Sequence, residues 1–292
     1  LALGFTGNMV QSNSIGAAFS EVFSARNIEI PSIVFGLILA AVIGFIFLGG
    51  VNRLASVVEK IVPIMAGIYI VGSLVLILMN ITALPEAIKM IFVGAFNPEA
   101  VVGAGAGIAV REAIRFGVAR GLFSNEAGMG STPHAHARAK VENPHKQGLA
   151  AMISVFIDTF IILNLTVFSI LTTGVLDSGK EGTALTQAAF TKGFGNFGDI
   201  FVAVCLLFFA FSTILGWHFF GEVNVKYLFG EKAAKFYSIL VIGFVIVGST
   251  LKVQLVWSLS DFFNGLMVIP NAIALWALSG IVVKICKQYG KK

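Results

Sequence analysis

Charged residues are scarce in this sequence: Asp, Glu, Lys and Arg make up 12% of its 292 residues. Soluble domains carry about twice that share, and the mean hydropathy of +0.91 indicates that membrane lipid is the solvent for most of the chain. The formal net charge is +5. Because no Lys/Arg-rich patch has interleaved aromatic residues, we expect no nucleic-acid partner.

Cysteines are also few. Cys205 and Cys286 both lie in or at the edge of apolar stretches, so no disulfide framework is expected. The GxSxG, HExxH and phosphate-loop signatures are absent, and we expect a protein that is not an enzyme and has no cofactor. The chain starts at Leu1 without Met or a charged leader, and we therefore expect a fragment of a longer protein.

Long apolar runs are what the sequence does contain. A helix needs about 20 apolar residues to cross a bilayer, and continuous runs of that length favour helices over strands. We therefore predict an all-α, polytopic membrane protein. Its eight predicted spans lie at about 1–22, 32–51, 61–81, 98–120, 149–174, 198–220, 234–250 and 255–283.

The basic residues predict an orientation in the plasma (inner) membrane. If the first span runs from inside to outside, the inside loops hold twelve Lys and Arg residues and the outside loops hold five. This follows the positive-inside rule and places the C-terminus in the cytoplasm. The three basic residues left, Arg111, Arg115 and Arg120, are expected towards the inner end of the fourth span.

Small and polar residues form a stripe on one face of the first span, at i, i+3, i+4, i+7 and i+10: Gly4, Gly7, Asn8, Gln11 and Ser14. The stripe either packs against other helices or lines a cavity, where Gln11 would offer a donor and an acceptor to a polar ligand. The residues alone leave both interpretations open.

The fourth span contains VGAGAGI at residues 102–108. Glycine costs about 1 kcal/mol in a helix interior, so we favour an unwound break here over a close helix crossing. A broken membrane helix exposes backbone groups that can bind a carboxylate, an ammonium or Na⁺. The candidate substrate-binding residues are Gly103, Ala104, Gly105, Ala106, Gly107 and Ile108.

In the sixth span, Ser212 and Thr213 are adjacent hydroxyls, and Trp217 lies one turn after Thr213. The hydroxyls either bond back to their own helix or bind Na⁺. Asp158 and Asp261 are ionisable residues inside spans, which makes them functional candidates by default. We expect Asp158 deep in its span and Asp261 nearer the outer end of the last one.

Several stretches together resemble one known family. RGLFSNEAGMGSTPHAHA and PHKQG resemble the signature of the alanine or glycine:cation symporter family (sodium:alanine symporters). So do, in the same order along the chain, GNMVQSNSI, VPIMAGIY, VFIDTFII, FAFSTILGW and VWSLSDFFNGLMVIPN. The resemblance covers nearly the whole chain.

The resemblance implies a leucine-transporter-type fold of two inverted five-helix repeats within one transporter domain. Residues 1–97 would be the remainder of the first repeat, 98–283 the second repeat, and 284–292 a cytoplasmic tail. It also implies sodium-coupled symport of alanine or glycine into the cell. A proton-coupled carrier using Asp158, a channel, and a metalloenzyme using His134, His136 and Glu126 remain alternatives.

The family also implies roles for individual residues. The run Gly103–Gly107 corresponds to the unwound middle of the sixth core helix, and Gln11 to a residue that bonds the substrate carboxylate. Trp217 would close the pocket over a small side chain. Ser212 and Thr213 match hydroxyls of the sodium site of this fold; no other metal is expected.

The polar segment SNEAGMGS (124–131) lies between the basic residues of the fourth span and Arg138, Lys140 and Lys146. We therefore expect it at the cytoplasmic end of that span. Ser124 or Asn125 would cap a short helix, with Glu126 in its first turn. The alternative is a direct role in substrate binding for Asn125 or Glu126.

Overall fold

The computed structural model describes residues 1–47, 49–96 and 106–290, and within those ranges the chain is helical without strands, as expected. The elements in chain order are η1 (Ala2–Thr6), α1 (Gly7–Ser24), α2 (Ser32–Phe47), α3 (Gly50–Met79), η2 (Ile81–Ala83), α4 (Leu84–Phe96), α6 (Ala106–Asn125), α7 (Pro133–His136), α8 (Pro144–Phe156), η4 (Ile157–Ile162), α9 (Leu163–Thr173), η5 (Leu176–Ser178), α10 (Gly182–Phe194), η6 (Gly195–Phe197), α11 (Gly198–Phe229), α12 (Glu231–Thr250) and α13 (Val253–Tyr289).

Among the described residues, five helical stretches are long and apolar enough to cross a membrane: Arg53–Met79, Pro144–Thr173, Gly182–Phe229, Glu231–Thr250 and Val253–Tyr289. Helix α2 is apolar but shorter. Helices α1 and α6 are not among the five, and they are the two that carry the polar stripe and the run of arginines. These findings support a multi-pass membrane protein, and the count of eight spans stays a prediction.

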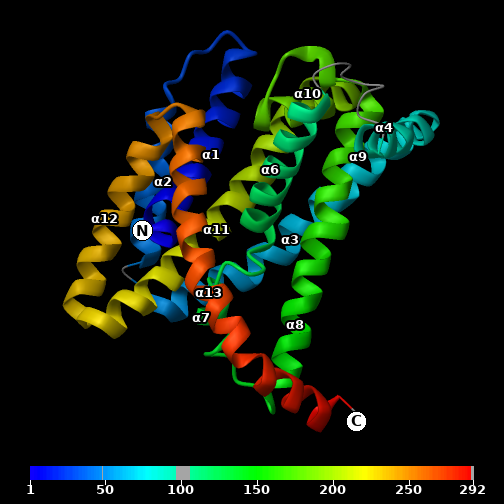
Figure 1. The fold of residues 1–292 in the computed structure, drawn as a ribbon. Helices are drawn as coiled ribbons and strands as arrows, with labels where there is room; N and C mark the ends of the chain where they lie inside the picture. The colour runs from blue at the N-terminus through cyan, green and yellow to red at the C-terminus, as the bar shows by residue number, and fades with distance from the viewer. Residues whose placement is uncertain (48, 97–105, 291–292) are drawn as a thin grey trace.

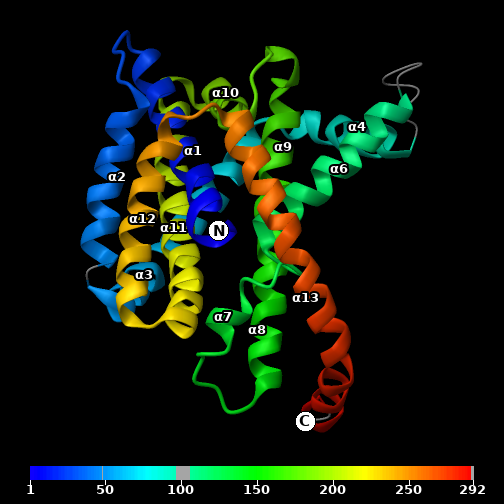
Figure 2. The ribbon, with the colours of Figure 1, turned by 60° about the vertical axis from the view of Figure 1, so that its left-hand side comes forward.

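The chain passes back and forth between two ends of a helical bundle (Figures 1 and 2). The connections α1–α2, α9–α10 and α12–α13 lie at one end, shown at the top. The connections α7–α8 and α11–α12 lie at the other end, near the C-terminus. The loops that the charge pattern assigns to one side of the membrane therefore share one end of the bundle.

Helices α1, α2, α11 and α12 pack against one another. Close approach is possible because small residues sit at the crossings: a Cβ on Gly248 would lie 2.6 Å from Cα of Met9, and one on Gly36 would lie 2.1 Å from Oγ of Ser249. In lipid, such packing and interhelical hydrogen bonds drive association. Asn13 on α1 supplies two, from Nδ2 to the carbonyl oxygens of Gly248 (2.9 Å) and Leu251 (2.7 Å).

An ion pair at the top of the bundle fixes the end of α1 to the start of α11. The two Nη atoms of Arg26 donate to the two carboxylate oxygens of Asp199, at 2.7 and 3.2 Å. The hydrogen bond to Asp199 raises the pKa of Arg26, so this guanidinium stays charged. Nearby, Lys180 pairs with Glu21 at 2.7 Å.

Candidate functional site

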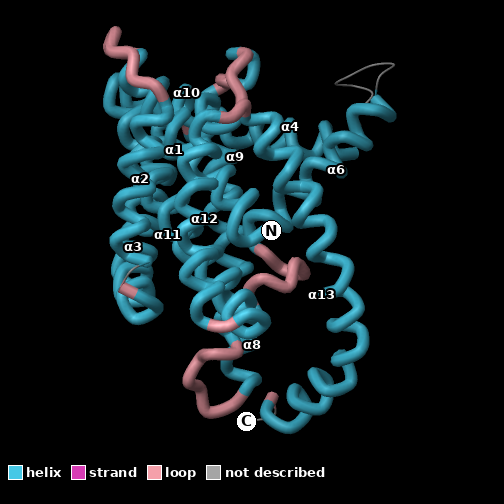
Figure 3. The backbone as a smooth tube through the Cα atoms, turned by 90° about the vertical axis from the view of Figure 1, so that its left-hand side faces the viewer, coloured by secondary structure: helices cyan, strands magenta, loops and turns pink. Residues whose placement is uncertain are grey.

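Helix α6 stops midway between the two ends of the bundle, where Figure 3 shows a loop away from both. Its last residue is Asn125, and the N–H of Glu126 closes the final turn on the carbonyl of Leu122 at 2.9 Å. Glu126 has a φ of 56°, and Gly128 and Gly130 have φ of 87° and 84°. Such left-handed backbone ends a helix. Helix structure resumes only at α7, and we call residues 126–132 the α6–α7 break.

This position corrects the expectation for Glu126, whereas the predicted break at 103–107 lies mostly outside the described residues. Of the predicted break, Gly103, Ala104 and Gly105 lie outside the described residues, whereas Ala106, Gly107 and Ile108 begin the regular helix α6. Glu126 is not in the first turn of a helix, as expected, but follows the last turn of α6. The signal that could have found the break is the cluster of Ser, Asn and Gly in SNEAGMGS, which is typical of turns.

The α6–α7 break leaves backbone donors free. The N–H groups of Gly128, Gly130, Ser131 and Thr132 donate to no other described residue. The N–H of Ala127, by contrast, donates to Oδ1 of Asn125 at 3.0 Å. Free N–H groups in a broken membrane helix can bind a carboxylate, and the two glycines let a ligand approach the backbone closely.

The carboxylate of Glu126 contacts the predicted pocket residue Trp217. The indole Nε1 of Trp217 donates to Oε1 of Glu126 at 2.6 Å, and the hydroxyl of Ser131 donates to Oε2. Among the described residues, no cation lies within ion-pair distance of Glu126. An ionised carboxylate in such a site is stabilised by a neighbouring cation.

Trp217 is 2% exposed and packs against the start of α1. A Cβ on Gly7 would lie 1.9 Å from its Cζ3 atom, and one on Gly4 would lie 2.0 Å from the Tyr237 hydroxyl. Helix packing therefore explains the two glycines of the polar stripe. Gln11, one turn beyond Gly7, is partly exposed, and its side chain makes no hydrogen bond to the described part of the chain, which leaves its amide available to a ligand.

Aromatic rings continue from Trp217 towards α13. The ring of Phe123 lies 5.2 Å from Trp217 and 5.0 Å from Trp257, measured between ring centroids. Arg120 lies over Trp257, 3.9 Å from its centroid, and donates to Asp261 at 2.5 Å. We expected Arg120 near the inner end of its span and Asp261 near the outer end. These two expectations cannot both hold, because an ion pair places both side chains at the same depth.

A hollow of about 450 Å³ lies between α6 and α13 and adjoins the α6–α7 break. Its lining includes Phe123, Met129, Asp261 and Asn264. Asn264 is 8% exposed, and its Oδ1 has no hydrogen-bond partner among the described residues. The hollow therefore presents mainly apolar walls beside the free backbone groups, and the unused oxygen of Asn264 is buried behind them.

The end of α6 is also held from the side of η4, a π-helical turn. Ser124 donates to both carboxylate oxygens of Asp158, at 3.0 and 2.9 Å. The amide of Asn125 donates to the Thr159 hydroxyl at 3.0 Å. Single-turn π-helices inside longer helices are frequent at functional sites. Asp158 and Asn125 thus position the start of the α6–α7 break.

The two predicted sodium ligands bond to their own helix. The hydroxyls of Ser212 and Thr213 both donate to the carbonyl oxygen of Phe209, each at 2.9 Å. Each hydroxyl oxygen keeps lone pairs with which it could accept a cation, so the sodium assignment stays a prediction. Within the described residues, no three His, Cys, Asp or Glu side chains are grouped to hold another metal.

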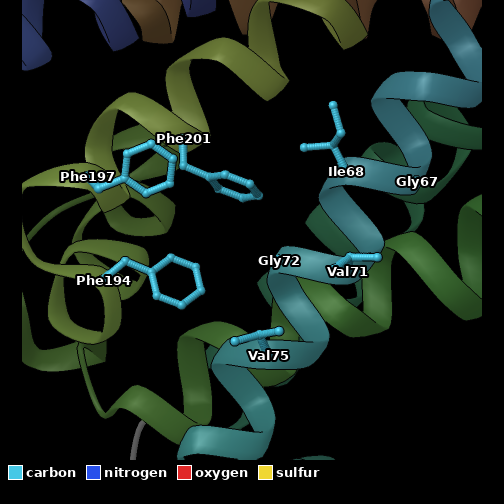
Figure 4. A pocket seen from close by; sticks show the side chains of 8 residues that line it. All are labelled: Gly67, Ile68, Val71, Gly72, Val75, Phe194, Phe197 and Phe201. Atoms are coloured by element: carbon cyan, nitrogen blue, oxygen red, sulfur yellow. The ribbon is translucent and has the colours of Figure 1, made fainter.

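A second hollow, of about 670 Å³, lies between α3 and the chain around α10–α11 (Figure 4). Figure 4 shows Ile68, Val71 and Val75 facing Phe194, Phe197 and Phe201, with carbon alone on the side chains. The Phe201 ring rests where Gly72 has no side chain, since a Cβ there would lie 2.2 Å from Cζ of Phe201. An apolar groove of this kind cannot hold a zwitterion, so it is not the substrate site.

Comparison with known proteins shows the family to which the chain is similar. A model described as the sodium:alanine symporter family matches residues 1–292. "Amino-acid carrier protein AlsT" of Bacillus subtilis is 40% identical, with 100% of this chain and 61% of that protein covered. "Sodium/alanine symporter AgcS" of Methanococcus maripaludis is 38% identical, with 98% and 62% covered. "Sodium/proton-dependent alanine carrier protein" of Bacillus sp. PS3 is 34% identical, with 96% and 65% covered. The chain spans about three fifths of the length of these curated relatives.

Proposed function

Since the chain belongs to the sodium:alanine symporter family, we propose that its protein is a secondary active transporter that carries alanine into the cell with Na⁺. The observation that carries this proposal is the α6–α7 break beside Trp217. It combines free backbone donors, an unpaired carboxylate and aromatic walls in one place. A small zwitterion needs such a mixture of groups.

The substrate carboxylate would be bound by the free N–H groups of Gly128, Gly130, Ser131 and Thr132, with Gln11 donating from α1. The site expected at Gly103–Gly107 stays a separate prediction, because most of that run lies outside the described residues. Trp217 and Phe123 would limit the side chain to a methyl group or a hydrogen atom, which favours alanine or glycine. The substrate ammonium needs an acceptor, for which the break offers carbonyl and carboxylate oxygens.

Sodium would bind the hydroxyl oxygens of Ser212 and Thr213, one turn before Trp217. A cation there would bind better to one conformation of the carrier than to the other, and its gradient would then bias the carrier towards the loaded state. Some relatives carry names that include a proton as well as sodium. Proton coupling, for which Asp158 is the candidate, is therefore the competing proposal.

The test is uptake of labelled alanine by the full-length protein reconstituted in proteoliposomes. We expect an inward sodium gradient to drive accumulation, and replacing sodium with choline to abolish it. Accumulation in sodium-free buffer under an inward proton gradient would support proton coupling instead. Flux that does not saturate with alanine would indicate a channel, and no alanine flux under either gradient would overturn the proposal.

A further inference from the structure

Among the described residues, Glu126 and Asp158 have no cation within ion-pair distance, whereas three other carboxylates of the bundle do. Asp199 pairs with Arg26, Asp261 with Arg120 and Glu21 with Lys180. The two hydrogen bonds to Glu126 come from neutral groups, the Trp217 indole and the Ser131 hydroxyl. An unpaired charge away from water is costly. We therefore expect a cation to bind beside Glu126 when the site is loaded.

The geometry around Glu126 leaves room for one more donor. An ionised carboxylate has about four lone-pair sites, and the indole and the hydroxyl occupy one on each oxygen. The side chain is partly exposed rather than sealed, and it leaves the backbone at the start of the break, two residues before the first free N–H group. A molecule held by those N–H groups would therefore have Glu126 within reach.

We propose that Glu126 binds the α-ammonium group of the transported amino acid. This rests on the proposed function and adds to it the residue that selects for an amino group. The ammonium would complete the lone-pair sites of the carboxylate, while the free N–H groups of the break hold the substrate carboxylate. A charge-assisted hydrogen bond of this kind is about twice as strong as a neutral one.

Charge balance would then couple the binding of Na⁺ to the binding of the substrate. A zwitterion is neutral, so it cannot cancel the negative charge of Glu126 when both its ends are bound. One Na⁺ at Ser212 and Thr213 would balance the charge of Glu126, which lowers the electrostatic cost of the loaded state in a low-dielectric interior. The substrate alone would leave the charge of Glu126 unbalanced. Na⁺ alone would leave the carboxylate without its ammonium donor.

The alternative is that Glu126 serves only to hold Trp217 in place, and two variants separate these roles. Glu126→Gln removes the charge but keeps an oxygen that can accept from the indole. Trp217→Phe removes the hydrogen bond but keeps the charge. The readout is inhibition of labelled alanine uptake by unlabelled alanine and by lactate, which shares the methyl group and the carboxylate but lacks the ammonium.

In the wild type we expect alanine to inhibit far better than lactate. Glu126→Gln should reduce the ratio of the two half-inhibitory concentrations by at least about ten-fold, because the preference for an ammonium is lost. Trp217→Phe should weaken both inhibitors together and keep the ratio. An unchanged ratio in Glu126→Gln overturns the proposal, even if uptake is slower. Absence of sodium-dependent alanine uptake in the wild type would instead overturn the proposed function.

Discussion

Arg120 on α6 and Asp261 on α13 form an ion pair of 2.5 Å, and the guanidinium also covers the face of Trp257. The two residues are separated by 141 positions in the sequence. Each side chain is about one third exposed, at 34% and 32%. The pair links the half of the broken helix that precedes the break to the last helix of the chain.

Removing one partner of this pair should destabilise the protein more than removing both. Arg120→Gln or Asp261→Asn leaves the other charge without a partner, and we expect a loss of about 1–2 kcal/mol, reduced from the buried limit because the groups are partly solvated. The double variant should recover part of the loss. Thermal unfolding in detergent measures this, and additive single effects would contradict the coupling.

Asn13 should be essential for the packing of α1 on α12. Asn13→Ala leaves the carbonyl oxygens of Gly248 and Leu251 without their donor, which should cost about 1–3 kcal/mol. Ser14→Ala is the matched control on the same helix, since its hydroxyl makes no hydrogen bond within the described residues. Equal melting temperatures for the two variants would contradict this role.

Thr213→Ala should weaken the response to sodium rather than the transport step itself. If its hydroxyl is a sodium ligand, the sodium concentration for half-maximal alanine uptake rises several-fold, and saturating sodium restores most of the rate. Thr172→Ala provides a control, because that hydroxyl also bonds back to its own helix, to Phe168 at 2.6 Å. An equal loss of uptake at every sodium concentration would argue against the assignment.

The two cysteines can test the orientation. Cys286 is exposed near the end of α13, whereas Cys205 is buried on α11. With the C-terminus in the cytoplasm, a membrane-impermeant maleimide should label the protein only after the cells are permeabilised. Cys286→Ser should remove the label and Cys205→Ser should keep it. Labelling of intact cells would reverse the predicted topology.

The sequence predicted the helices well because apolar runs of about 20 residues allow few other structures in lipid. Family resemblance made Trp217 and Gln11 candidates for substrate binding, and the structure places Trp217 beside the break. The sequence did not predict the break at residues 126–132, because the alternating glycines at 103–107, most of which lie outside the described residues, outweighed the turn residues of SNEAGMGS. Helix propensity describes one segment at a time, whereas a break needs partners elsewhere to hold its ends.

Contacts between distant helices could not be predicted in the same way. Hydropathy shows that a helix lies in the membrane but does not show which neighbour it faces. The orientation argument placed Arg120 and Asp261 by counting residues along straight spans, and a helix that stops midway invalidates that count. The contact of Glu126 with Trp217 was missed for the same reason, since a segment assigned to the cytoplasmic end could not reach the middle of α11.

The left-handed backbone of Glu126 has a mechanical consequence. A continuous helix transmits tilt and rotation along its whole length, because each turn is bonded to the next. At Glu126 that ladder of hydrogen bonds ends, and α6 and α7 share no turn across residues 126–132. The ladder of α6 therefore does not transmit tilt or rotation to α7, and the side chain where it ends is the carboxylate that touches Trp217.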